Sequence, residues 1–124
     1  MNGAITQIEV KLPKKKVLVK KLCTKYKWDY SKIIEKTGIK NVYHSSKDES
    51  AIKLAISAAK KITKKNKKID AIIYVTQSPE FFLPTNACVI QNKLGLKKNI
   101  IAYDINQGCT GFVYGLYNSQ LLLQ

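Results

Sequence analysis

Cys109 lies at the junction of two apolar segments, residues 99–105 before it and residues 111–123 after it. The first segment has the length and composition of a buried strand, and the second is predicted to be a helix that Cys109 opens. A sharp turn between such a strand and such a helix lifts one side chain to the carboxyl edge of a sheet, as in the nucleophile elbow of hydrolases. The first amide groups of the helix favour a negatively charged thiolate there. The pattern therefore predicts a nucleophilic cysteine, and a buried structural cysteine is the alternative.

The other reactive side chains are few. The sequence has one histidine, His44, and three cysteines, Cys23, Cys88 and Cys109. A single histidine excludes a metal site built from several histidines and limits acid–base chemistry. Three cysteines so far apart do not make a disulfide framework. We therefore expect a reduced protein without a bound metal, and we interpret Cys23 and Cys88 as structural.

The charge of the chain comes almost wholly from lysine. Among 124 residues there are 22 basic ones, all lysine, and 8 acidic ones, for a net charge of +14. A polyanion-binding module is one interpretation of this charge. Arginine is absent, although its planar group is the usual reader of nucleic acid, so we expect no nucleic-acid partner. A lysine surface that aids encounter with acidic partners is the favoured interpretation, and a coding bias toward lysine is its alternative.

Alternating strand and helix patterns predict an α/β fold with a mixed, largely parallel sheet. The strand patterns cover residues 5–12, 69–76 and 99–105. Helical patterns precede the last helix at residues 19–25, 31–36, 51–62 and 85–94. Ser46 and Glu49 have the spacing of a capping box and are expected to begin the helix that follows them. Gly38 and Gly95 are expected to end the helices before them.

The last predicted helix is apolar on nearly every side. Gly111, Gly115 and Ser119 form a strip of small residues, and bulky residues such as Phe112 and Leu116 occupy other faces. We expect a buried central helix. Polar residues in this segment argue against a membrane span, which needs about 20 mostly apolar residues. The chain ends within the helix pattern and has few elements to surround it. We expect one domain, residues 1–124, that is truncated at its C-terminus or covered by a partner chain.

Four segments resemble the 3-oxoacyl-ACP synthase III family of the thiolase superfamily. Residues 104–112 read DINQGCTGF, which is similar to the active-site segment of that family. Residues 33–39, ending in TGI, residues 70–79 and residues 83–91 match further family segments in the same order. The resemblance covers essentially the whole chain, but only the N-terminal part of the family's subunit.

This resemblance implies the N-terminal half of a thiolase-like fold and an acyltransferase of fatty-acid biosynthesis. The family's cysteine, which Cys109 matches, takes an acyl group from acyl-CoA, and decarboxylative condensation with malonyl-ACP follows. Acyl-CoA and acyl carrier protein enter as substrates, and no cofactor is implied. Backbone amides, including that of the cysteine itself, hold the oxyanion.

The catalytic histidine and asparagine of the family have no counterpart in this sequence. His44 matches a loop, and both catalytic groups belong to the family's second half. We therefore expect these 124 residues alone to be inactive in condensation. An inactive dimerising fragment is one alternative. Condensing enzymes of polyketide, surface-glycan or hydroxymethylglutaryl-type pathways are others.

Three substrate-binding positions follow from the same resemblance. Lys36 stands where the family usually has an arginine near CoA, and lysine keeps the charge without the bidentate phosphate contact. Trp28 resembles an adenine-stacking tryptophan but falls a few residues early, and core packing is its alternative. Leu83 matches an apolar residue that enters the acyl pocket of the partner subunit, which implies a homodimer; a plain loop leucine is the alternative. The chain does not begin with a signal-peptide pattern, so we expect a cytoplasmic protein.

Overall fold

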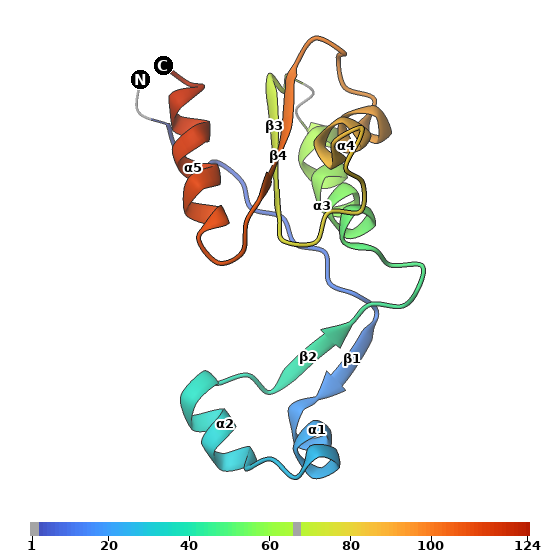
Figure 1. Ribbon diagram of the computed structural model, residues 1–124, viewed down its shortest axis with the longest axis vertical. Helices are drawn as coiled ribbons and strands as arrows, with labels where there is room; N and C mark the ends of the chain where they lie inside the picture. The colour runs from blue at the N-terminus through green and yellow to red at the C-terminus, as the bar shows by residue number, and fades with distance from the viewer. Residues whose placement is uncertain (1–2, 66–67) are drawn as a thin grey trace. The chain divides into compact units, whose positions relative to one another are not determined.

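The structure is a computed structural model that describes residues 3–65 and 68–124 (Figure 1). It divides into two compact units, one of residues 12–50 and one of residues 51–124 together with the segment that ends at Lys11. Each unit has a sheet of two strands and its own helices.

The unit of residues 12–50 is built on an antiparallel strand pair. β1 (Lys15–Leu18) pairs with β2 (Asn41–His44), and α1 (Val19–Tyr26) and α2 (Tyr30–Thr37) separate the two strands in sequence. These helices confirm the two helical patterns predicted before residue 38. The two strands are only four residues long, which is too short for an alternating pattern to be recognised.

Local side-chain chemistry explains where α2 begins and ends. The Asp29 carboxylate accepts a hydrogen bond from the Lys32 amide at 3.1 Å, which caps the N-terminus of the helix. Gly38 ends the helix with a φ of 65°, a left-handed conformation that glycine adopts without a steric penalty. The predicted stop at Gly38 is therefore confirmed.

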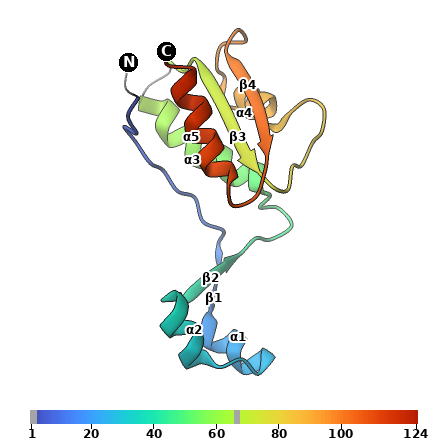
Figure 2. The ribbon, with the colours of Figure 1, turned by 60° about the vertical axis from the view of Figure 1, so that its left-hand side comes forward.

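The larger unit has three layers. β3 (Ala71–Thr76) and β4 (Ile101–Asn106) form a parallel pair, and α5 (Gly111–Leu121) covers one face of it. α4 (Asn86–Leu94) covers the other face, with α3 (Ala51–Lys65) packed against it on that side (Figures 1 and 2). The parallel arrangement, the helix at 86–94 and its stop at Gly95 agree with the sequence pattern.

Buried apolar side chains lie on the two helices that form one side of the larger unit, where α3 packs on α4 and α4 packs on the sheet. Ile52 on α3 and Ala87 and Ile90 on α4 are buried. The lysines of α3 are exposed, as the amphipathic pattern predicts. The core of this unit therefore lies between the two strands and the helices at 51–65 and 86–94.

The predicted strand at residues 5–12 is wrong. This segment has no regular structure, and no strand pairs with it among residues 3–65 and 68–124. Its apolar side chains Ile5, Ile8 and Val10 are more than 60% exposed. Lys61 of α3 holds the segment instead, through an ion pair with Glu9 at 3.2 Å and a hydrogen bond to the Val10 carbonyl at 3.3 Å. An alternating pattern forms a strand only where a neighbouring strand can satisfy its backbone.

The predicted capping box is also wrong, because α3 begins at Ala51 rather than directly after Ser46. Ser46 and Glu49 form a turn, in which the Glu49 amide donates to the Ser46 carbonyl at 3.0 Å. The Glu49 carboxylate accepts from the Ser46 amide at 3.3 Å and from the Lys14 amide at 3.2 Å. The carboxylate therefore ties the turn to the start of β1, an interaction that local spacing cannot reveal.

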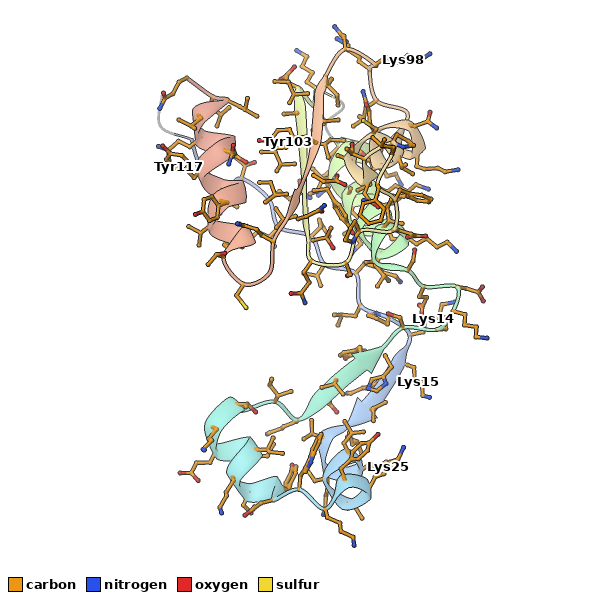
Figure 3. The ribbon with its side chains drawn as sticks, in the orientation of Figure 1. Lys14, Lys15, Lys25, Lys98, Tyr103 and Tyr117 are labelled. Carbon is orange, nitrogen blue, oxygen red and sulfur yellow. The ribbon has the colours of Figure 1, made fainter. Side chains whose placement is uncertain are left out.

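The last helix is only half buried, which corrects the expectation of a helix surrounded on all sides. Gly111 and Gly115 are buried against the sheet, whereas Phe112, Val113 and Tyr117 are each at least 60% exposed. Tyr117, labelled in Figure 3, points from α5 away from β3 and β4. Within the described part of the chain, no element covers this bulky side.

Candidate active site around Cys109

Cys109 lies in the tight turn between β4 and α5. β4 ends at Asn106, and the Gly111 amide donates to the Gly108 carbonyl at 2.9 Å, which closes the turn around Cys109. The helix begins at Gly111, two residues later than predicted. Thr110 already has helical backbone angles, with φ −78° and ψ −16°, so the turn runs directly into the helix. The thiol is exposed and not in a disulfide.

Two glycines fix α5, and with it the turn, against the sheet. A Cβ atom at Gly111 would lie 2.6 Å from Cγ1 of Val75, and one at Gly115 would lie 2.9 Å from Cγ2 of the same residue. Both distances are too short for a real contact, so only glycine lets the helix approach β3 this closely. Within the small-residue strip, Gly111 and Gly115 therefore lie directly against the Val75 side chain. Phe112, the residue after Gly111, lines the same surface depression as Cys109.

The thiol opens onto a surface depression at the carboxyl edge of the parallel strands. Thr76 lies opposite Asn106 in the strand register, so the two segments that follow meet at one edge. The depression is lined by residues from both segments and from the first turn of α5: Val75, Thr76, Gln77, Gln107, Gly108, Cys109 and Phe112. A small reagent can therefore reach the sulfur among amide side chains and one aromatic ring.

Gln77, the residue that follows β3, brings a polar side chain close to the turn. Its Oε1 atom lies 3.0 Å from the position of a Cβ atom at Gly108. Because Gly108 carries no side chain, the Gln77 amide reaches the backbone next to Cys109. The sequence indicates a polar turn after the strand, and the structure places Gln77 in the lining of the depression that also contains Cys109.

Leu83 belongs to the same unit as Cys109 but does not line the depression. It lies in the loop between β3 and α4 and is 88% exposed, and the neighbouring Phe82 is 86% exposed. The peptide bond between Leu83 and Pro84 is cis. The loop thus carries two large apolar side chains into solvent.

Lys36 and Trp28 belong to the unit of residues 12–50. Lys36 is exposed in the last turn of α2. Trp28 is 54% exposed and stacks on Tyr26 with a ring separation of 5.1 Å, so packing in a core is excluded for it. The Lys25 ammonium group lies over the Tyr26 ring, 5.1 Å from its centroid (Lys25 is labelled in Figure 3). These side chains form an exposed aromatic surface with positive charge beside it.

The remaining reactive residues do not assemble a second site. Cys23 is buried in α1, and the Cys88 thiol accepts a hydrogen bond from the Thr85 hydroxyl at 3.3 Å. His44 is exposed at the end of β2. No cluster of three or more potential metal ligands occurs among the described residues. No helix in residues 3–65 or 68–124 is long and apolar enough to cross a membrane.

Sequence reasoning missed the polar contacts of Asp104 behind the site. Asp104 lies on β4 and accepts hydrogen bonds from the amides of Asn86 and Ala87 at 2.8 Å. It also lies opposite Tyr74. Burial raises the pKa of the Tyr74 hydroxyl, a hydrogen bond with Thr76 opposes the rise, and the Asp104 carboxylate adds to it. A charged residue inside an otherwise apolar strand is the signal that could have revealed this contact.

Comparison with known proteins points to one group of enzymes, although no family model matches the chain. The beta-ketoacyl-[acyl-carrier-protein] synthase III of Clostridium perfringens strain SM101 is 42% identical over 96 residues, which cover 74% of this chain and 29% of that protein. A solved 3-oxoacyl-(acyl-carrier-protein) synthase III has a TM-score of 0.88 at 35% identity, over 98% of this chain and 38% of the other.

A second solved protein shares the fold at lower identity. The HMG synthase of the curacin biosynthetic pathway, in complex with holo donor-ACP, has a TM-score of 0.85 at 24% identity, over 96% of this chain and 30% of the other. The chain thus spans about a third of the length of the proteins it matches.

Proposed function

Since the chain is homologous to the N-terminal part of 3-oxoacyl-ACP synthase III, and so belongs to that family with its thiolase-like fold, we propose that Cys109 is an acyl-accepting nucleophile. The observation that carries this proposal is the exposed thiol in the turn between β4 and α5, open to a depression at the carboxyl edge of the parallel strands. Ligands of open α/β sheets bind at this edge.

In the proposed reaction, the Cys109 thiolate attacks the carbonyl carbon of an acyl-CoA. The C–S bond to the cysteine forms, the C–S bond to CoA breaks, and CoA leaves as the thiolate, which takes up a proton. Amide groups near the start of α5 favour the negative charge of the attacking sulfur and of the oxyanion. Condensation with malonyl-ACP, in a fatty-acid pathway, is the proposed later step of a protein that spans the full length of its relatives.

The proposed substrates are an acyl-CoA and an acyl carrier protein, with no further cofactor. The family resemblance and the exposed Trp28 and Lys36 support a CoA-binding role for residues 12–50, because an aromatic face and a positive charge suit an adenine ring and a phosphate. The net charge of +14 suits encounter with an acidic carrier protein. We place the protein in the cytoplasm, where the thiol stays reduced.

A homodimer is part of the proposal. It is supported by the exposed apolar side chains of Phe82 and Leu83 on one loop, and by the family position that Leu83 matches. We propose that Leu83 enters an apolar pocket of a second copy of this chain.

A dimerising module without acyl transfer is the second candidate function. The bulky side of α5 favours it, since Val113 and Tyr117 are exposed and lie on a helix whose other side already packs on the sheet. Large exposed apolar patches mark interaction surfaces. This candidate predicts self-association without any covalent adduct.

Intact-mass measurement after incubation with acetyl-CoA or octanoyl-CoA tests the proposed acyl transfer. We expect one acyl adduct on the wild-type chain, none on Cys109→Ser, and an unchanged adduct on the control Cys88→Ser. Iodoacetamide labelling of the same proteins reports whether Cys109 is accessible. A chain that iodoacetamide labels at Cys109, but that acyl-CoA leaves unmodified, would contradict acyl transfer by this chain and favour the dimerising module.

A further inference from the structure

Asn86 is a buried polar residue of the larger unit. Its side chain is hydrogen-bonded both to the loop between β3 and α4 and to Asp104 on β4. It is 0% exposed. Its Oδ1 atom accepts hydrogen bonds from the amides of Glu80 at 3.1 Å and Phe81 at 3.3 Å, and its Nδ2 atom donates to the Phe81 carbonyl at 3.0 Å. The side chain thus replaces three hydrogen bonds that the loop backbone would otherwise make with water.

Asp104 connects Asn86 to β4. Its Oδ2 atom accepts from the Asn86 amide and from Asn86 Nδ2, each at 2.8 Å, and its Oδ1 atom accepts from the Ala87 amide at 2.8 Å. Asn86 and Ala87 are the first residues of α4, so the carboxylate also lies at the positive end of the helix. Short hydrogen bonds to a charged acceptor are among the stronger ones in proteins.

The loop that Asn86 holds carries the exposed apolar tip. Phe81 is fixed through both its amide and its carbonyl, and the next two residues, Phe82 and Leu83, are 86% and 88% exposed. A loop fixed at its base does not lose that conformational freedom again when its tip is bound. Strongly exposed side chains next to a hydrogen-bonded backbone are the arrangement expected of a loop that is ordered before it binds.

We propose that Asn86 and Asp104 are positioning residues that hold residues 80–83 ready for binding, so that Leu83 is presented to the second copy of the chain. The identity of this partner rests on the proposed function, whereas the holding of the loop rests on the hydrogen bonds themselves. Asp104 binds the first amides of α4 and so fixes this helix to β4. Asn86, at the start of α4, then holds the loop through its hydrogen bonds to Glu80 and Phe81.

The two residues can be separated by mutation. Asn86→Ala removes the three bonds to the loop and one to Asp104, but keeps both backbone bonds of α4 to the carboxylate. Asp104→Asn keeps the shape of the side chain and one acceptor oxygen. We therefore expect its effect on the loop to lie between that of the wild type and that of Asn86→Ala. Asn92→Ala is the matched control, because Asn92 is an exposed asparagine of the same helix.

Hydrogen exchange on the full chain tests the positioning directly. We expect Asn86→Ala to speed exchange of the Glu80 and Phe81 amides by about tenfold or more, with exchange in β3 and β4 unchanged. Asn92→Ala should leave both regions as in the wild type. Unchanged exchange at these two amides would overturn the proposal. Equally faster exchange throughout residues 51–124 would overturn it as well, since the pair would then support the whole unit.

Self-association tests whether the ordered loop matters for binding. The measurement uses sedimentation velocity, in a background that carries Val113→Ser and Tyr117→Ser so that α5 does not contribute. We expect Leu83→Ala and Asn86→Ala each to weaken dimerisation by about tenfold or more, and only Asn86→Ala to change loop exchange. A dimer as tight in Asn86→Ala as in the background would overturn the link between loop order and binding. A background chain that never dimerises would refute the proposed homodimer, and the exchange data would still decide the role of Asn86.

Discussion

The two faces of the β3–β4 pair are joined to their helices in different ways. On the face toward α4, the Asp104 carboxylate binds the first two amides of the helix, and Asn86, Ala87 and Ile90 are buried. On the face toward α5, Gly111 and Gly115 pack directly against Val75. In the described part of the chain, the α4 face is therefore held by directional hydrogen bonds as well as apolar packing, and the α5 face by close packing.

This difference suits the roles we propose for the two faces. Hydrogen bonds define the position of α4 and of the loop before it, which carries Leu83. Close contact of two glycines lets α5 approach the sheet, so that the turn with Cys109 meets the edge where β3 and β4 end. The outer side of α5 stays apolar and exposed.

Removing the carboxylate of Asp104 should have the largest effect on stability. Asp104→Ala leaves the amides of Asn86 and Ala87 without their acceptor and removes one of the two hydrogen bonds that Asn86 Nδ2 donates, at a cost of about 3 kcal/mol or more in the free energy of unfolding. Urea denaturation measures this. The control Asp70→Ala removes an exposed carboxylate just before β3 and should cost less than about 0.5 kcal/mol. Equal effects of the two variants would refute the role given to hydrogen bonds on the α4 face.

A methyl group at Gly111 should come next. Gly111→Ala puts Cβ within 2.6 Å of the Val75 side chain, and we expect a loss of about 1–3 kcal/mol from overpacking. Val75→Ala in the same chain should recover part of this loss, because it removes the clashing methyl groups. A double-mutant cycle by urea denaturation gives the coupling. Simple additivity of the two changes would contradict packing by shape at this face.

Polar substitutions on the outer side of α5 should barely change stability. Val113→Ser with Tyr117→Ser should shift the free energy of unfolding by no more than about 1 kcal/mol in total, because both side chains are exposed. Light scattering should show less concentration-dependent association than in the wild type. The control Gln120→Ser, on the same helix, should change neither quantity. Marked unfolding of the double variant would mean that the bulky side of α5 is packed.

The smallest expected effect concerns alkaline pH. The pKa of Tyr74 is raised above 10.0 in the folded chain by burial, with Asp104 adding to the rise. The unfolded chain then loses the Tyr74 proton first, so stability from this group is present below pH 10 and is lost as the pH rises through the folded pKa. Tyr74→Phe should flatten this fall between pH 9.5 and 11, measured by urea midpoints and compared with the exposed Tyr43→Phe. If stability falls equally steeply with pH in Tyr74→Phe and Tyr43→Phe, Tyr74 is excluded as the source of this fall.

Much of the fold could be read from local patterns. The apolar runs at β3 and β4, the helices at 51–65 and 86–94, and the stops at Gly38 and Gly95 agree with expectation. Each depends on side-chain periodicity or on glycine, which act within one or two turns of chain. The family resemblance likewise follows from short segments, and the comparisons bear it out.

Expectations failed where a local pattern needed a distant partner. The segment at 5–12 alternates like a strand but has no strand beside it in the described chain, and Glu49 binds the Lys14 amide 35 residues away instead of beginning a helix. The contacts of Asp104 with α4 span 17 and 18 residues. In the sequence, the one sign of these contacts is that an aspartate lies within an apolar strand.

By itself, the sequence determined the turn that carries Cys109, the small-residue strip that follows it, and the alternation of strands with helices. The tertiary structure decided which side of α5 is buried, that Gln77 and Cys109 line one depression, and that Asn86 is hydrogen-bonded to both Asp104 and the backbone of Glu80 and Phe81. The reason is physical. Propensity, capping and periodicity act between near neighbours in the chain, whereas hydrogen bonds and close packing across a sheet depend on a register that forms only when distant segments meet.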